Sequence, residues 1–189
     1  MKERIHPTPL STKGKTIILL IILGILAMWG FAIYAYLLMP KAVPAHFGIS
    51  GEPTRYGHKS GFFILPIVST IIPVLFLLLT KYRFTLINKY PNLGNFPTFL
   101  ITNLPKISEE KRGVWINKYF ESIILGTGFA FTIFFFIAEI VIFFGEIQGK
   151  LSLWFIVFSI TMPVWLILAL IFYLRKFKLE MLKEIKEIP

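Results

Sequence analysis

The sequence contains no cysteine and no aspartate, and it has few charged residues for its length. Without cysteine, disulfides, thiolate metal sites and cysteine nucleophiles are excluded. All ten acidic residues are glutamates, so mechanisms that need a catalytic aspartate are excluded as well. Charged residues form 16% of the 189 residues and hydrophobic residues form 56%, whereas a soluble domain carries about 25% charged residues. The composition therefore predicts a chain that faces lipid rather than water.

Four apolar stretches are long enough to cross a membrane as helices. A spanning helix needs about 20 apolar residues, since the hydrocarbon layer is about 30 Å thick and each residue rises about 1.5 Å. We expect spans at about residues 16–39, 62–80, 119–144 and 153–174. The first stretch is longer than the apolar core of a signal peptide and ends in bulky residues, so we expect it to be retained. The predicted fold class is all-α: a polytopic membrane protein of a single domain with four transmembrane helices.

Lysine and arginine are distributed unequally among the segments that flank these spans. The amino terminus, the 81–118 loop and the 175–189 tail hold sixteen of the twenty, and the two remaining loops hold four. Because basic residues near span ends stay on the cytoplasmic side, both termini are predicted to be cytoplasmic, in the cell membrane. The same bias accounts for the net charge of +10. It indicates contact with anionic lipid headgroups and no nucleic-acid partner.

Residues 40–61 form an external loop that is rich in proline and glycine. These residues favour turns, so we expect a compact, turn-rich cap and not a helix. Within it, His46, Glu52 and His58 could share a metal ion, because imidazoles and a carboxylate suit zinc. Their spacing matches no recognised ligand pattern, and the alternative is that they orient the loop through hydrogen bonds. Both interpretations stay open at this point.

The cytoplasmic loop, residues 81–118, contains an apolar run at 96–105 that is too short to span a membrane. We expect this run to lie in the headgroup region or to re-enter the membrane slightly. Ser108, followed by Glu109 and Glu110, is typical of a helix start, with a hydroxyl cap and two acids at the positive end of the dipole. That helix is predicted to continue into the third span.

The tail, residues 175–189, places Leu179, Leu182, Ile185 and Ile188 at steps of three, with lysine and glutamate on the remaining face. This pattern predicts a short amphipathic helix that lies along the inner headgroups. A partner-binding motif is the alternative.

Two glutamates lie within or beside the third span, where a carboxylate is costly and usually faces the bundle interior with a partner. Glu121 and Glu139 are eighteen residues apart, which is five full turns of an ideal helix, so they are predicted to share one stripe. Gly128 and Thr132 fall close to that stripe and would allow a neighbouring helix to approach. We expect Glu121 to extend toward the headgroups or to pair with Lys118.

Glu139 is predicted to lie near the outer end of the span, below the external loop. Its expected partners are Arg55, Lys59 or His46; otherwise it is held protonated in an apolar site. It is the residue on which a polar functional centre would depend.

Three prolines, Pro66, Pro73 and Pro163, fall inside the second and fourth spans. A proline cannot donate to its helix, so it leaves a carbonyl without its usual donor. Four nearby hydroxyl groups could help to satisfy these carbonyls: Ser69, Thr70, Ser159 and Thr161.

The external loop reads MPxxVPxHF and then GxPxxYGxK at the head of the second span. This pattern resembles the domain-of-unknown-function family that forms the amino-terminal half of SdpI-type bacterial immunity proteins. The resemblance covers about half the chain, from the first span through Pro66 and more faintly to Pro97. Gly48 stands where the family often has asparagine, and Thr54 where it often has aspartate. The resemblance implies a multi-pass membrane protein that protects a cell from a secreted toxic peptide and relays its presence to a repressor.

Two classes of function follow. The first is a non-enzymatic binding or signalling protein of the immunity or sensing type, with a peptide or small-molecule ligand at the external loop. The second is a small membrane carrier or a metal-dependent membrane enzyme that uses Glu139 and His46. The sequence points to no catalytic residue, does not identify a cofactor, and leaves self-association into a homo-oligomer open. The candidate functional residues are His46, Glu52, Arg55, Tyr56, His58, Lys59 and Glu139.

Overall fold

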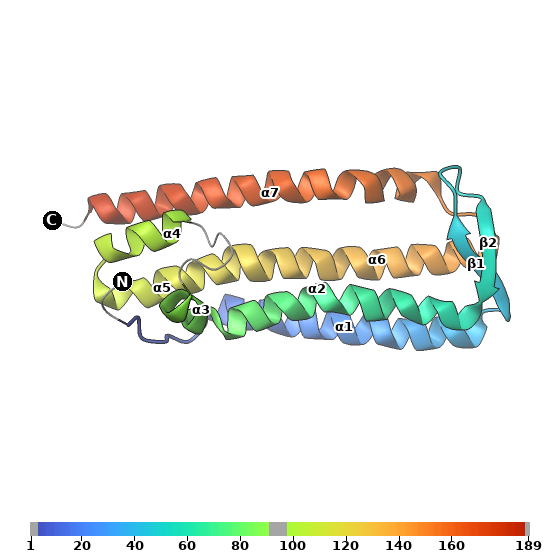
Figure 1. The fold of residues 1–189 in the computed structure, drawn as a ribbon, viewed down its shortest axis with the longest axis horizontal. Helices are drawn as coiled ribbons and strands as arrows, with labels where there is room; N and C mark the ends of the chain where they lie inside the picture. The colour runs from blue at the N-terminus through green and yellow to red at the C-terminus, as the bar shows by residue number, and fades with distance from the viewer. Residues whose placement is uncertain (1–3, 91–97, 188–189) are drawn as a thin grey trace. The chain divides into compact units, whose positions relative to one another are not determined.

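The computed structural model describes residues 4–90 and 98–187 of the chain. Four helices among them are long and apolar enough to cross a membrane (Figure 1): Thr12–Leu38, Lys59–Lys81, Glu109–Gln148 and Leu153–Lys186. Each overlaps one predicted span, so the all-α, polytopic fold class is confirmed.

The third of these helices changes its winding along its length. Helix α5 (Glu109–Tyr119) continues through a π-helical segment, η4 (Phe120–Leu125), into α6 (Gly126–Gln148). The predicted start is confirmed, because the helix begins directly after Ser108 with two glutamates in its first turn. The Ser108 side chain, however, makes no capping hydrogen bond.

The chain divides into two compact units. The terminal unit consists of Met1–Ile18, Leu75–Gly128 and Leu168–Pro189, and the hairpin unit consists of Leu19–Val74 and Phe129–Ile167. Four long helices contribute residues to both units: α1 (Thr12–Leu38), α2 (Ile64–Lys81), α6 and α7 (Leu153–Lys186).

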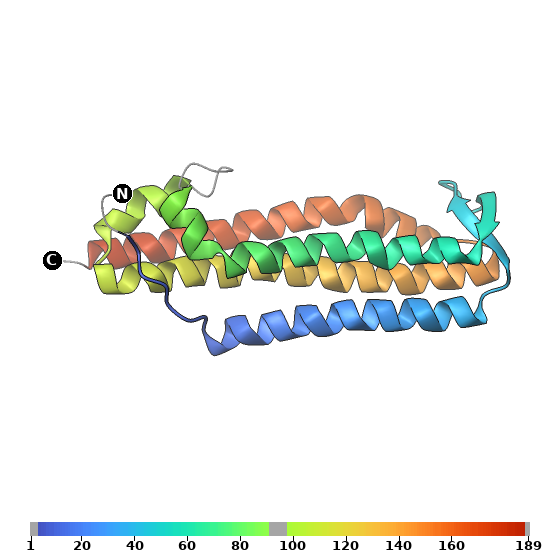
Figure 2. The same ribbon diagram turned by 60° about the horizontal axis from the view of Figure 1, so that its bottom comes forward.

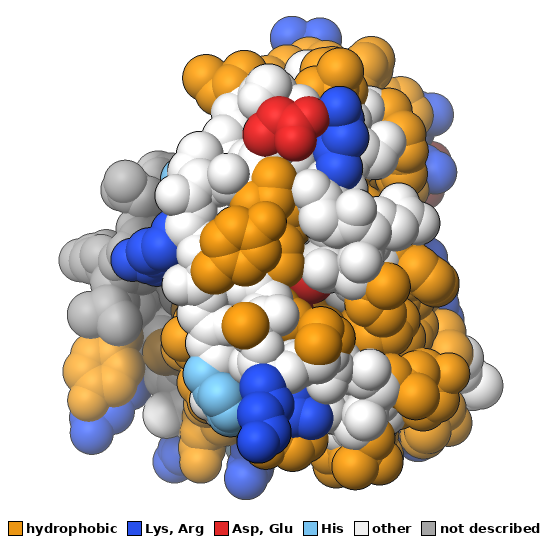
Figure 3. Space-filling model, turned by 90° about the vertical axis from the view of Figure 1, so that its right-hand side faces the viewer, with side chains coloured by type: hydrophobic (Ala, Val, Ile, Leu, Met, Phe, Trp, Pro, Cys, Tyr) orange, Lys and Arg blue, Asp and Glu red, His pale blue; other side chains and the backbone are white. Residues whose placement is uncertain are grey.

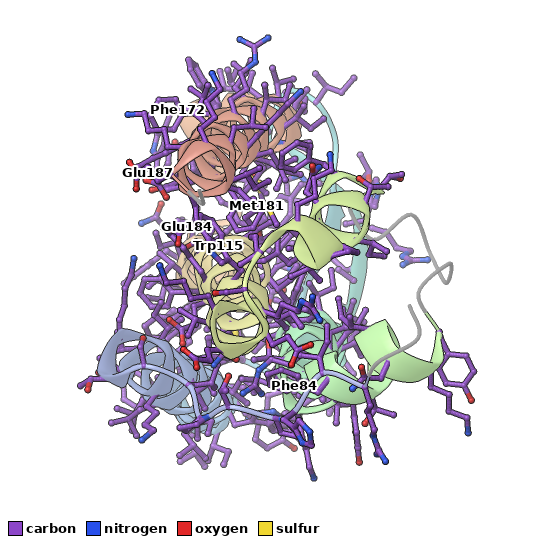
Figure 4. All side chains as sticks on the ribbon, turned by 90° about the vertical axis from the view of Figure 1, so that its left-hand side faces the viewer. Phe84, Trp115, Phe172, Met181, Glu184 and Glu187 are labelled. Carbon is purple, nitrogen blue, oxygen red and sulfur yellow. The ribbon has the colours of Figure 1, made fainter. Side chains whose placement is uncertain are left out.

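The core of the terminal unit joins α5 to the end of α7 and to three short helices. These are α3 (Arg83–Lys89), α4 (Thr98–Asn103) and the 3₁₀ turn η3 (Leu104–Lys106). Trp115 of α5 and Phe177 of α7 meet edge to face, with ring centroids 5.4 Å apart. Met181 is turned from α7 toward Trp115, whereas Phe172 points away from this core (Figure 4).

The tail is part of α7, and one of its faces packs against the protein. Phe177 and Met181 are buried and Ile185 packs against them, while Leu179 is 62% exposed. Ile188 lies outside the described residues. Side chains at steps of three and four along one helix face a common neighbour, so the stripe that includes Met181, and not Leu179, meets the core. Two ion pairs join the same stretch of α7 to α5, from Lys111 to Glu184 (2.6 Å) and from Lys118 to Glu180 (2.8 Å).

The described part of the apolar run at 96–105 forms α4 and η3, and residues 96 and 97 lie outside the described residues. Leu100 and Leu104 are fully buried in the core of the terminal unit. Other protein side chains cover these two, so they do not contact lipid themselves; the position of the run in the headgroup region stays a prediction.

In the hairpin unit, the loop at residues 40–61 folds into an antiparallel β-hairpin between α1 and α2 (Figure 2). Strand β1 (Ala42–Phe47) pairs with β2 (Pro53–His58), and a 3₁₀ turn, η1 (Lys59–Phe63), leads into α2. The pairing is irregular on both sides of His46. The loop is a cap, as predicted, but its strands were not anticipated.

Apolar side chains of the hairpin unit pack where β1, η1, α1 and α6 meet. Phe143 of α6 lies edge to face with Phe31 of α1 and with Phe62 of η1. The distances between the ring centroids are 5.4 Å and 6.4 Å. Further along, Gly24 of α1 faces Thr132 of α6 so closely that a Cβ at Gly24 would overlap the threonine methyl group. The predicted close approach of a helix at Thr132 is thus confirmed.

Candidate functional site

The base of the hairpin is held to the end of α1 by one lysine. The Lys59 ammonium donates to the carbonyl oxygens of Tyr36 (2.8 Å) and Met39 (3.2 Å) and lies over the Tyr36 ring. A cation at a helix C-terminus satisfies carbonyls that lack a partner in the helix and opposes the negative end of the dipole. Lys59 therefore fastens the hairpin to α1 instead of pairing with Glu139.

The tip of the hairpin is held by the connection between α6 and α7. The amide of Leu151 donates to the Gly51 carbonyl (2.8 Å), and Glu52 forms an ion pair with Lys150 (2.7 Å). On this face of the hairpin unit an acidic side chain lies directly against a basic one (Figure 3). Gly51 has a φ of +79° and no room for a side chain. Lys59 at the base and Leu151 with Lys150 at the tip thus anchor both ends of the hairpin.

The three metal candidates of this loop each have a separate neighbour. His46 Nδ1 lies 2.6 Å from the Thr54 hydroxyl, and His58 Nδ1 accepts from the Ser60 amide (3.2 Å). Glu52 forms its ion pair with Lys150. Within 4–90 and 98–187, no three histidine or glutamate side chains are placed to hold a metal ion together. The geometry thus corresponds to the alternative in which these groups orient the loop.

Glu139 lies on α6 and is only 2% exposed. Neither of its carboxylate oxygens has a hydrogen-bond partner among the described residues. The expected pairing with Arg55, Lys59 or His46 is therefore wrong. Lys59 binds carbonyls at the end of α1, and His46 lies against Thr54. The other expectation, an acid in an apolar site, matches its surroundings.

Glu139 faces a cavity of about 380 Å³ that is lined by α2, α6 and α7 of the hairpin unit. Phe134, Phe135 and Phe155 are among its apolar walls, and its remaining polar side chains are Ser69 and Ser159. The Ser159 hydroxyl is buried and, like the carboxylate, has no partner in the described part of the chain. The site thus combines an apolar volume with uncommitted polar atoms, which is the usual composition of a small-molecule site.

The second glutamate, Glu121, belongs to the terminal unit and has a structural partner. It is 7% exposed and accepts from the Ser11 amide (2.7 Å) and hydroxyl (2.5 Å) just before α1. A carboxylate at a helix N-terminus satisfies free amides and the positive end of the dipole. The expected pairing with Lys118 is wrong, because Lys118 binds Glu180. The π-helical turns of η4 also break the ideal angular step on which the shared stripe with Glu139 was based.

Arg83 holds the segment before α1 from the other side. It donates to Asn117 Oδ1 (2.6 Å), to the Thr80 carbonyl (2.9 Å) and to the Thr8 carbonyl (2.8 Å). Burial lowers the pKa of Arg83, and the nearby carboxylate of Glu121 opposes that shift. This network explains the buried charge of the terminal unit without a ligand.

Sequence reasoning missed the two serines as members of a site, although a signal for them exists. Ser69 and Ser159 each stand four residues before a proline within a helix, Pro73 and Pro163. The same spacing in two different spans could have marked both positions. The sequence could not show that Ser69 and Ser159 line the same cavity as Glu139.

Comparison with known proteins places the chain in a family. Residues 23–70, which include most of α1, the hairpin and the start of α2, match the model of a domain of unknown function (DUF1648). An "Uncharacterized protein" of Archaeoglobus fulgidus is 38% identical over 191 aligned residues, which cover 97% of this chain and 99% of that protein. The chain belongs to the same family as this Archaeoglobus fulgidus protein. Together with its four apolar helices, the match identifies a multi-pass integral membrane protein. No solved structure matches the chain.

Proposed function

We propose that this integral membrane protein is a non-enzymatic binding protein of the SdpI-like immunity or sensing type, with its ligand site at Glu139. The observation that carries the proposal is the buried, unbonded carboxyl group facing an apolar cavity. A buried polar group without a partner is costly, so the site gains when a ligand supplies the missing bond. Sensing is favoured because the cavity is lined by three helices, α2, α6 and α7, whose packing a ligand would bias.

The proposed setting is the cell membrane with both termini in the cytoplasm, supported by the distribution of basic residues. The hairpin then faces outward, and the basic segments of the other side contact anionic headgroups. A secreted ligand would reach the hairpin unit first.

The test is a ligand screen on the purified full chain in detergent, read by thermal unfolding. A compound that binds only the folded protein must raise its melting temperature. We expect hits that stabilise the parent and lose their effect in Glu139→Gln, but keep it in Glu146→Gln, a change on the same helix outside the cavity lining. Hits that act equally on all three proteins would contradict the site, and a screen of a broad library without any hit would contradict the function.

A proton-coupled carrier is the second candidate, favoured by the position of an unpaired acid within a span. It predicts that hits are also moved across liposome membranes when a pH gradient is applied. Binding without such movement supports the sensing function.

A further inference from the structure

We propose that the Glu139 cavity takes a hydrophobic ammonium ion from the bilayer and that Glu139 releases a proton to water when the ion binds. The inference rests on the proposed binding function and names the class of ligand. In the free protein the carboxylic acid is neutral, because an ionised carboxylate without a partner is strongly disfavoured in an apolar site. On binding, the acid O–H bond breaks, the proton leaves to water, and the carboxylate pairs with the R–NH₃⁺ group. The cavity is neutral before and after.

The polar side chains in the cavity lining offer four oxygen atoms as acceptors, two from the Glu139 carboxyl group and one each from Ser69 and Ser159. Pro73 and Pro163 have no N–H, so they cannot donate to the carbonyls of Ser69 and Ser159, the residues four positions earlier that line the cavity with Glu139. The carboxyl group adds two oxygens. Once it has lost its proton, the two serine hydroxyls are the sole side-chain donors in the lining. An ammonium group has three donors and no acceptor, so it can donate hydrogen bonds to these acceptor oxygens.

The apolar walls select the rest of the ligand. Three phenylalanine rings, Phe134, Phe135 and Phe155, line the cavity, and aromatic faces attract cations as well as apolar groups. The volume of about 380 Å³ is at the small end of the range of about 300–1,000 Å³ for small-molecule sites. This favours a single aromatic or short alkyl body.

The direction of entry follows from the exposed rim. Ile64 and Val68 of α2 line the cavity and are 62% and 55% exposed. Exposed apolar side chains on a spanning helix face lipid, so a ligand dissolved in the bilayer meets the site directly.

Among the described residues, Glu139 is the only ionisable side chain in the cavity lining. The cavity walls of α2 and α7 contain no titratable residue, and α6 contributes Glu139 alone. The stretch of α1 in this unit, Leu19–Leu38, has no acidic, basic or histidine residue. Glu146, also on α6, is not in the lining. Lys59 and Lys150 are bound to the α1 carbonyls and to Glu52. A divalent cation beside this single carboxylate would keep one uncompensated positive charge in an apolar site, which is costly.

The test uses three probes of one shape: 4-phenylbutylammonium, the neutral 4-phenylbutanol and the anionic 4-phenylbutyrate. Calorimetry on the full chain in neutral detergent should show binding of the ammonium at least tenfold tighter than of either analogue. In weakly buffered solution about one proton should appear per ammonium bound. By linkage, the apparent affinity should rise with pH, by up to tenfold per pH unit while the free acid is protonated.

Two variants locate the effect. Glu139→Gln should lose the preference for the ammonium, the proton release and the pH dependence, whereas Glu146→Gln should keep all three. Equal binding of the alcohol and the ammonium without proton release would overturn this inference but leave the proposed binding function standing. Proton release is measured on the parent protein, so the inference can fail even if Glu139→Gln does not fold. If neither the probes nor any library compound binds in a Glu139-dependent way, the proposed function fails with it.

Discussion

Leu151 donates its amide hydrogen to the carbonyl of Gly51, 100 residues earlier in the chain, and thereby fastens the hairpin tip to the α6–α7 connection. A Cβ at Gly51 would overlap the Leu151 carbonyl oxygen, and the Gly51 φ of +79° also disfavours a side chain. The hairpin can therefore dock at this point only with glycine at its tip.

Gly51→Ala should lower the free energy of unfolding by about 2–3 kcal/mol, since it adds a steric overlap to a backbone cost of about 1 kcal/mol. Gly149→Ala is the matched control, because Gly149 also has a positive φ (+69°) but open space around its Cα. Thermal unfolding in detergent measures both variants. Equal losses would show that docking of the tip adds nothing to the backbone effect.

Glu121→Gln should destabilise the protein by about 1.5–3 kcal/mol, because a charged acceptor of two hydrogen bonds from Ser11 is lost. Combined with Ser11→Ala in a double-mutant cycle, the two changes should show a coupling of about 0.5–3 kcal/mol. Glu110→Gln, at an exposed position, serves as the control. Purely additive losses would argue against the contact between Glu121 and the start of α1.

Met181→Ala should cost about 2–5 kcal/mol, as expected when a fully buried methionine is truncated. Leu179→Ala, on the exposed face of the same helix, should change stability by less than about 0.5 kcal/mol. The pair tests which face of the tail packs against α5. The reverse order of the two losses would show that the face with Leu179, and not the face with Met181, packs against the protein.

Topology is tested by reporter fusions, and the bias of basic residues predicts their readings. Fusions after residues 50 and 148 should report an external position, and fusions after residues 106 and 185 should report a cytoplasmic one. An internal signal at residue 50 would reverse the orientation and place the hairpin on the cytoplasmic side.

The helices could be read from the sequence because length and apolarity decide them locally. A stretch of about 20 apolar residues can satisfy its backbone in lipid only as a helix, and α1, α2, α6 and α7 follow that rule. The start of α5 after Ser108 could be predicted too, since acids in a first turn act on the nearest amides. The hairpin was missed because its strands carry prolines, Pro44 and Pro53, which normally argue against strand pairing.

Only the tertiary structure decided which side chains meet. The sequence places Glu139 at a depth in its span but does not say whether the loop or two other helices surround it. Likewise, Glu121 could have bound Lys118 three residues away, and instead it binds Ser11, 110 residues earlier. Partners of this kind depend on how helices rotate and approach one another, and close contacts such as Gly24 with Thr132 fix those rotations by excluded volume. Composition determined that the chain lies in a membrane, and packing determined that one of its acids faces a cavity without a partner.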